Sequence, residues 1–145
     1  MVSDTAWKSV EAECPLLAKA GYSHVQLSSP NEHIYGESWA TSYQPVSYKL
    51  ESKRGSAAEL KSMVAACNKA GIAVAMDVIL NHASSQISRI GSDGYGVGFA
   101  GSKYKKYDYP GIYGNADFHT CRKTITNYQN ANECVRLLRI AILSA

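Results

Sequence analysis

The sequence predicts an α/β fold built on a strand–helix–strand unit. Residues 24–28 and 72–80 are short stretches of strand-forming residues, and the second is largely apolar, as buried parallel strands are. Between them, residues 56–70 carry apolar side chains at the helical period. A helix that links two strands in this order favours a parallel pair joined by a crossover.

A first helix is expected at residues 7–20, ahead of the first strand. Its apolar side chains fall on one face, which comprises Val10, Cys14, Leu17 and Ala18. Gly21 follows, and glycine is typical of helix ends. Residues 24–28 then form the first strand, although only two of them are apolar.

The second helix carries its own start signal. Ser56 suits the N-cap, and Glu59 three residues later completes a capping box, in which each side chain binds the other residue's backbone N–H. The apolar face of this helix comprises Leu60, Met63, Val64 and Cys67. We therefore expect the helix to begin at Ser56 and to end before Gly71.

The second strand ends in polar residues, which is unusual for a buried strand. Asp77 interrupts the apolar run, and Asn81 and His82 close it. The carboxyl ends of parallel strands carry the ligand chemistry of α/β proteins, so these side chains are candidates for a functional site. An open alternative is that Asp77 and Asn81 only bind nearby backbone and that His82 starts an ordinary loop.

Two long stretches, residues 30–53 and 83–130, have no clear period. Their frequent aromatic residues argue against disorder, and long ordered loops are usually functional. The basic run Lys103–Lys106 resembles segments that contact nucleic acid. A solvated loop is the preferred interpretation of this run, so no nucleic-acid partner is predicted.

Length and composition narrow the class of protein. A chain of 145 residues with 46% hydrophobic residues and a net charge of +3 fits at most one modest globular domain. No run approaches the roughly 20 apolar residues of a membrane span, and residues 1–5 lack the features of a secretory leader. The four cysteines have no metal-type spacing, so they form either two disulfides, as in oxidising compartments, or four free buried thiols.

Several linked motifs identify a family. In order along the chain stand Val25–Ile34 (VQLSSPNEHI), Trp39, Tyr43–Tyr48 (YQPVSY), Ser52–Gly55 (SKRG) and Asp77–His82 (DVILNH). At these spacings they resemble the amino-terminal part of secreted α-amylases, the starch-cleaving glycoside hydrolases built on a (β/α)8 barrel. The resemblance extends from about Trp7 to about Cys134.

A complete (β/α)8 barrel needs about 250 residues, so the resemblance implies an amino-terminal fragment. Residues 1–82 would form a partial barrel with about strands 2–3 and their flanking helices. Residues 83–145 would begin the irregular inserted domain of the family. The resemblance also implies disulfides Cys14–Cys67 and Cys121–Cys134, and a secreted parent protein whose leader this chain lacks.

The resemblance assigns four residues to glucan binding. His82 would line the subsite that holds the sugar whose bond is cleaved, and Trp39 and Tyr43 would stack on sugar rings with Gln44 beside them. The alternative for Trp39 is a hydrophobic plug over the barrel mouth. The family usually has a second tryptophan where this chain has Ala40, so one stacking surface is lost.

Calcium is the cofactor that the resemblance implies, as a structural ion. Asn81 would supply an amide oxygen, and Asn132 a backbone carbonyl. The family's carboxylate ligand aligns near Ile142, and no Asp or Glu follows Glu133. Because carboxylates supply most of the affinity for Ca²⁺, we do not expect tight calcium binding by this chain.

The family reaction is endohydrolysis of α-1,4-glucosidic bonds in starch or glycogen with retention of configuration. It needs two carboxyl groups about 5 Å apart, and the family takes them from later barrel strands. Asp77 is interpreted as a satisfied buried side chain, so no catalytic residue is predicted and the chain alone is expected to be inactive. The predicted partners of this monomer are starch, glycogen or maltooligosaccharides. Two alternatives are a non-catalytic carbohydrate-binding remnant and a small secreted disulfide-stapled protein without a sugar role.

Overall fold

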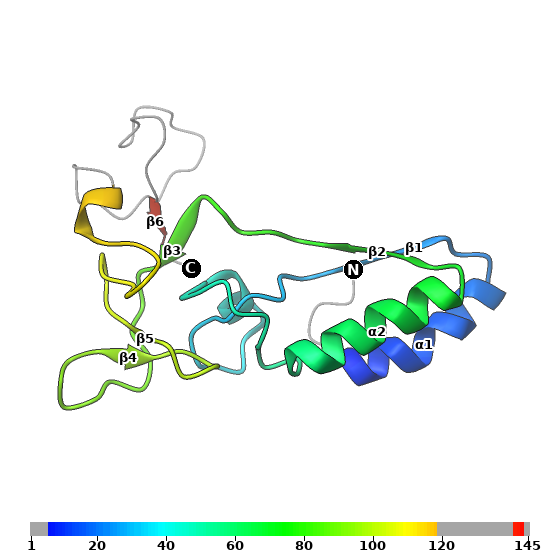
Figure 1. Ribbon diagram of the computed structural model, residues 1–145, viewed down its shortest axis with the longest axis horizontal. Coiled ribbons are helices and arrows are strands. Elements are labelled where there is room, and N and C mark those ends of the chain that lie inside the picture. The colour runs from blue at the N-terminus through cyan, green and yellow to red at the C-terminus, as the bar shows by residue number, and fades with distance from the viewer. Residues whose placement is uncertain (1–5, 119–140, 144–145) are drawn as a thin grey trace.

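A computed structural model describes residues 6–118 and 141–143 of the chain (Figure 1). Its helices and strands, in order, are α1 (Trp7–Lys19), β1 (His24–Leu27), the 3-10 helix η1 (Trp39–Tyr43), α2 (Ala57–Lys69), β2 (Ala73–Met76), β3 (His82–Ser84), β4 (Gly96–Val97), β5 (Lys103–Tyr104), the 3-10 helix η2 (Asn115–Asp117) and β6 (Ala141–Leu143). The described helices include none that is long and apolar enough to cross a bilayer.

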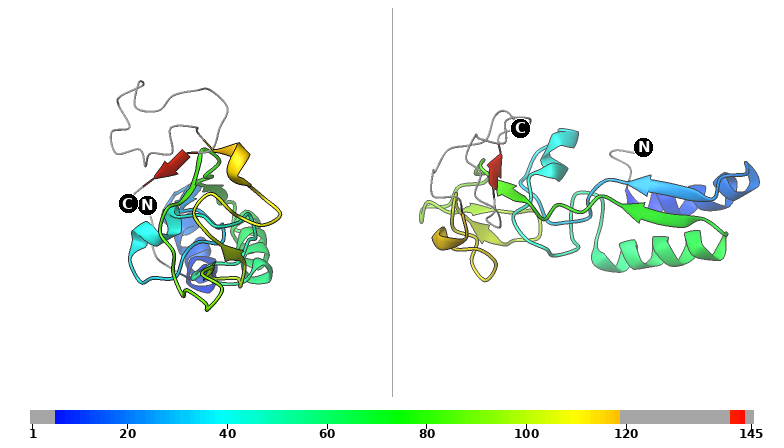
Figure 2. Two further views of the ribbon diagram at one scale, coloured as in Figure 1. Left: turned by 90° about the vertical axis from the view of Figure 1, so that its left-hand side faces the viewer. Right: turned by 90° about the horizontal axis from the view of Figure 1, so that it is seen from above.

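The predicted strand–helix–strand unit is present. Strands β1 and β2 pair in parallel, with His24 opposite Ala73 and Leu27 opposite Met76. Both α1 and α2 lie on one side of this pair, as the two views in Figure 2 confirm. Strand β2 is shorter than the predicted residues 72–80. The Asp77 N–H still donates to the carbonyl of Leu27 (3.0 Å), which is the last residue of β1, so the two strands end together.

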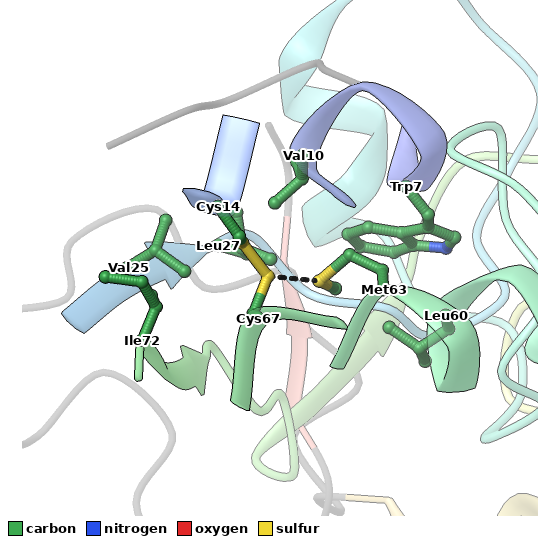
Figure 3. Packing of buried hydrophobic residues seen from close by; sticks show 9 residues of the cluster. All are labelled: Trp7, Val10, Cys14, Val25, Leu27, Leu60, Met63, Cys67 and Ile72. Atoms are coloured by element: carbon green, nitrogen blue, oxygen red, sulfur yellow. Dashed lines mark hydrogen bonds between the residues drawn. A yellow bond between two sulfur atoms is a disulfide. The ribbon is translucent and has the colours of Figure 1, made fainter. Parts of the chain in front are cut away.

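The helices pack on the sheet through one apolar cluster (Figure 3). It contains Trp7, Val10, Cys14, Val25, Leu27, Leu60, Met63, Cys67 and Ile72. Cys14 and Cys67 are fully buried and form a disulfide between α1 and α2, as the family resemblance implied. The second predicted disulfide, Cys121–Cys134, lies outside the described residues.

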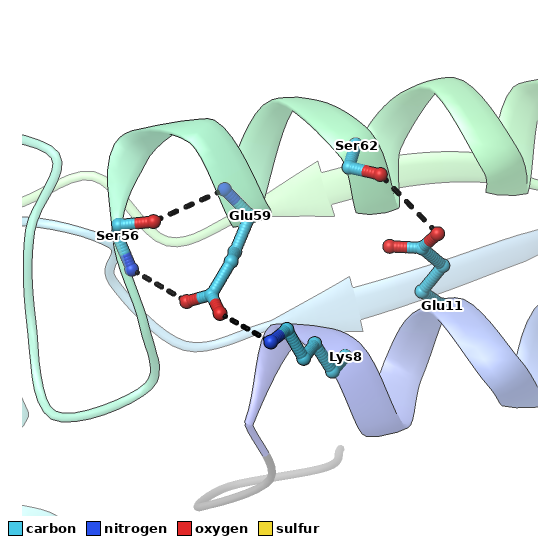
Figure 4. Close-up of polar contacts among 5 residues, drawn as sticks. All are labelled: Lys8, Glu11, Ser56, Glu59 and Ser62. Carbon is cyan, nitrogen blue, oxygen red and sulfur yellow. Dashed lines mark hydrogen bonds and ion pairs between the residues drawn. The ribbon is translucent and has the colours of Figure 1, made fainter.

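The predicted capping box at the start of α2 is confirmed (Figure 4). The Glu59 backbone N–H donates to Ser56 Oγ (3.3 Å), and the Ser56 N–H donates to the Glu59 carboxylate (2.9 Å). Lys8 of α1 lies 3.0 Å from the same carboxylate. This ion pair is exposed and contributes little, so the cap and the buried cluster determine how the two helices are held.

A second apolar cluster holds the irregular half of the chain together. Its buried members are Ile34, Val46, Ala83, Tyr104, Tyr109 and Phe118. Short pairs extend this half, with β3 parallel to β6 and β4 antiparallel to β5. Ile34 and Val46 come from the long loop before α2, so this loop packs with the later residues. The predicted division of the chain into a partial barrel (residues 1–82) and an inserted domain (residues 83–145) therefore stays a prediction.

Buried Glu32 joins the long loop to the later half. Its carboxylate accepts hydrogen bonds from the Ser47 hydroxyl (2.5 Å) and from the backbone N–H groups of Ala100 (2.8 Å) and Ser102 (3.0 Å). Its backbone pairs across the loop with Val46 and Lys49. The stretch without a sequence period is thus ordered by contacts between residues far apart in the chain.

Candidate functional site

The candidate site lies where η1 meets the chain between β2 and β3. Ser38 caps η1 by accepting a hydrogen bond from the Ala40 N–H (3.3 Å). The short helix carries Trp39 at its start and Tyr43 at its end, and their ring centroids are 6.0 Å apart in an edge-on arrangement. Trp39 is 59% exposed, so its ring is accessible to a ligand.

Asp77 fixes the Tyr43 side chain. The Tyr43 hydroxyl donates to Asp77 Oδ2 (2.6 Å), and Gln26 of β1 donates to Oδ1 (2.9 Å). Burial and this hydrogen bond raise the pKa of Tyr43 to about 12. The pKa of Asp77 is lowered, mainly by the hydrogen bond from Tyr43 and to a smaller extent by that from Gln26. Asp77 is therefore ionised at neutral pH and is poorly suited to act as a general acid. Its carboxylate is hydrogen-bonded, as predicted. The side chain is half-buried rather than buried, and it lies just after β2 rather than inside the strand, because the strand ends at Met76.

His82 joins the same site through the backbone of Tyr43. Its Nε2 donates to the Tyr43 carbonyl (2.9 Å), and its Nδ1 lies 3.1 Å from Asn81 Oδ1. Burial lowers the pKa of His82, opposed in part by the bond to Tyr43, so the imidazole is neutral at neutral pH. Because Nε2 carries the proton donated to Tyr43, Nδ1 of the neutral ring is an acceptor, and a hydroxyl of an uncharged ligand can donate to it.

Gln44 lies beside Tyr43 but is buried, with 3% of its surface exposed. Its side-chain oxygen has no hydrogen-bond partner among the described residues. Its backbone carbonyl accepts from Ile34, which holds the loop in place. The structure thus brings Trp39, Tyr43, Gln44 and His82 together, and their contacts with a ligand remain a prediction.

Asn81 is the predicted calcium ligand that lies among the described residues. Asn81 supplies one neutral oxygen, which already contacts His82. Within residues 6–118 and 141–143, no three His, Cys, Asp or Glu side chains gather to hold a metal ion. Ca²⁺ takes six to eight oxygens, so any site would depend on further ligands, and the predicted ligand Asn132 lies outside the described residues.

Two residues of the site were missed by the sequence analysis. Gln26 is a polar residue inside a strand, and that position was the available signal for its contact with Asp77. Lys53 donates from Nζ to the Ser38 carbonyl (2.8 Å) at the start of η1. Nothing in its local sequence indicates that contact, because the two residues are joined only by the folded loop.

The comparisons with known proteins agree on one family. The chain is 44% identical over 123 residues to the α-amylase of Streptomyces violaceus, covering 84% of this chain and 20% of that protein. It is 45% identical over 130 residues to the α-amylase of Thermomonospora curvata, covering 86% of this chain and 21% of the relative. The α-amylase-related protein of Drosophila atripex is 41% identical over 128 residues, which cover 83% of this chain and 25% of that protein. No protein-family model matches the sequence.

Solved structures give the same result. The crystal structure of α-amylase I from Eisenia fetida matches with a TM-score of 0.79 at 35% identity, over 96% of this chain and 30% of that one. A mutant of the same enzyme in complex with maltohexaose matches with a TM-score of 0.80 at 34% identity, over 97% of this chain and 30% of that one.

The fold and the sequence matches place this chain among the glycoside hydrolases. More particularly, it belongs to the α-amylase family. The chain spans between a fifth and a third of the length of these relatives.

Proposed function

We propose that this chain forms one wall of the glucan-binding site of a secreted α-amylase-like enzyme. That enzyme would hydrolyse internal α-1,4-glucosidic bonds of starch, glycogen or maltooligosaccharides with retention of configuration. The observation that carries the proposal is the group of Trp39, Tyr43 and His82, in which an exposed ring stands beside a tyrosine fixed by Asp77 and a neutral histidine. Sugar rings present apolar C–H faces that pack on such rings, and hydroxyls that bind such a histidine.

The β1–β2 pair would supply about strands 2–3 of a (β/α)8 barrel, and residues 83–145 the start of the inserted domain. Parallel pairing and helices on one side of the strands support this placement, because barrel helices cover only the outside. The Cys14–Cys67 disulfide supports a secreted parent protein. Calcium would be a structural ion there, with Asn81 and Asn132 among its ligands.

A maltohexaose titration tests the proposed binding. The chain has two tryptophans, and since Trp7 is 1% exposed, a ligand-dependent fluorescence change should come from Trp39. We expect saturable binding that Trp39→Ala abolishes. Tyr22→Ala is the control, because Tyr22 is equally exposed at 61% and lies outside the site. Absence of binding by the wild-type chain would favour a disulfide-stapled protein without a sugar role.

The chain alone should not hydrolyse starch. No catalytic residue is predicted in it, and Asp77 has both carboxylate oxygens engaged by Tyr43 and Gln26. The measurement is the release of reducing ends from soluble starch, compared with a heat-inactivated sample. Turnover that persists after repurification would contradict the prediction. Binding without turnover would be the behaviour of a carbohydrate-binding remnant.

Calcium should stabilise the chain only slightly. A ligand that binds only the folded state raises the free energy of unfolding by RT ln(1 + [L]/Kd), so a weak site gives a small increase. Thermal melts in calcium and in chelator should nearly coincide. Ile142→Asp should separate them if the family's carboxylate ligand aligns at that position. A rise of many degrees in the unmodified chain would show that other carboxylates complete a site.

A further inference from the structure

We propose that Lys53 is a positioning residue that holds the Trp39–Tyr43 aromatic pair in its binding geometry. The inference rests on the proposed function, because it assigns to Lys53 the task of ordering the surface on which a glucan ring would pack. Lys53 acts through the backbone of η1 and would not contact the sugar itself.

The Lys53 ammonium is directed at the start of η1. Nζ donates to the backbone carbonyls of Ser38 (2.8 Å) and Glu37 (3.3 Å) and to the Thr41 hydroxyl (3.3 Å). These three acceptors surround Trp39 in the sequence. The Thr41 hydroxyl in turn donates to the Ser38 carbonyl (2.7 Å). The Lys53 ammonium therefore binds residues on both sides of Trp39. Charge-assisted hydrogen bonds of this kind are stronger than neutral ones.

The start of η1, which carries Trp39, is held less firmly than its end, where Ser42 and Tyr43 bond to Arg54, Asp77 and His82. Helix η1 has five residues, and short 3-10 helices have weak hydrogen-bond geometry. The three residues before it, including Glu37 and Ser38, are exposed. Its cap bond from the Ala40 N–H to Ser38 is long, at 3.3 Å. At this exposed end of η1, Lys53 therefore adds to a small set of local bonds, which Thr41 makes with Gly36 and Ser38.

The backbone of Lys53 lies against the packed part of the fold. Its backbone N–H donates to Nε2 of buried His33 (3.4 Å), whose Nδ1 is bonded to the Ile34 carbonyl (2.7 Å). The next residue, buried Arg54, donates from Nη2 to Ser42 Oγ inside η1 (3.0 Å). The Arg54 carbonyl accepts from the Trp7 N–H (3.0 Å), which ties this turn to α1. Lys53 thus connects the packed part of the fold to the exposed aromatic segment.

The test compares Lys53→Met, which keeps the length of the side chain and removes its donors, with Lys53→Arg, which restores charged donors. Lys61→Met is the matched control, because Lys61 is an exposed lysine on a different helix, α2. The chain is labelled with 5-fluorotryptophan, so that ¹⁹F NMR gives separate signals for Trp39 and Trp7. Acrylamide quenching and maltohexaose titration are measured on the same samples.

Lys53→Met should shift and narrow the Trp39 signal and increase its quenching, while the buried Trp7 signal stays unchanged. Maltohexaose affinity should fall about three- to tenfold, the cost of ordering one or two side chains on binding. Lys53→Arg should recover most of both effects. An unchanged Trp39 signal in Lys53→Met would overturn the proposal, and so would an equal change at Trp7, since that would mark Lys53 as a general stability residue.

The two proposals fail separately. If the wild-type chain does not bind maltohexaose, the proposed function fails as regards this chain. The ordering of Trp39 by Lys53 is still decided by the NMR signals and the quenching, which need no ligand.

Discussion

Replacing Glu32 by alanine should lower the free energy of unfolding by about 3–5 kcal/mol. The carboxylate is fully buried and accepts hydrogen bonds from two backbone N–H groups, those of Ala100 and Ser102. Its removal takes a charged acceptor from these two part-buried donors, and a hydrogen bond to a charged group contributes about 1.5–3 kcal/mol. The Ser47 hydroxyl loses its acceptor as well.

The surroundings of Glu32 leave little room for the structure to adapt. A Cβ atom on Gly98 would lie 2.5 Å from Glu32 Oε1 and 2.4 Å from a methyl group of Val46, so the chain at Gly98 already packs directly on the carboxylate. Glu32→Gln keeps the shape and one acceptor oxygen, and it should cost less than Glu32→Ala. This order of effects separates the loss of hydrogen bonds from the loss of charge.

The measurement is urea denaturation followed by circular dichroism at neutral pH. Glu51→Ala is the control, because Glu51 lies on the same loop and is exposed. Substitutions of exposed residues away from such features usually change stability by less than about 0.5 kcal/mol. If Glu32→Ala were no more destabilising than Glu51→Ala, the carboxylate would not join the two halves as described.

The part of the fold that was predictable from the sequence is the part with local signals. The capping box of Ser56 and Glu59 and the apolar face of α2 are set by neighbours within one or two helical turns, and both are confirmed. The end of β2 was not predictable, because it depends on where β1 stops rather than on the apolar run itself. A strand lasts only as long as its partner can receive hydrogen bonds.

The sequence nominated the residues of the candidate site, but it gave no indication of their arrangement. The family resemblance singled out Trp39, Tyr43 and His82, whereas the bond from His82 to the Tyr43 carbonyl joins residues 39 positions apart. The conformation of the loop at residues 30–53 likewise depends on distant contacts, such as the hydrogen bonds from Ala100 and Ser102 to Glu32. Periodicity does not record contacts of this range, so the loop had no pattern from which to predict its shape.

Loss of the Cys14–Cys67 disulfide should lower the free energy of unfolding by about 4 kcal/mol. The two cysteines are 53 positions apart, and the loop-closure relation gives about 4 kcal/mol for a loop of that size at 25 °C. The disulfide joins α1 to α2 in the cluster that covers β1 and β2, so its loss allows the unfolded chain many more conformations. We expect the double variant Cys14→Ala/Cys67→Ala to show this loss in urea denaturation.

Two comparisons make this result specific to the disulfide. Reductant should destabilise the wild-type chain more than the double variant, in which only the predicted Cys121–Cys134 disulfide remains to be reduced. The difference separates the Cys14–Cys67 crosslink from the packing of the two side chains. Non-reducing peptide mapping of the oxidised wild-type chain should recover Cys14 joined to Cys67. A peptide that joins Cys14 to Cys121 or Cys134 would contradict the pairing. Glu32 lies outside this cluster, so combining Glu32→Ala with the double variant should give additive losses, because distant sites that share no partners act independently.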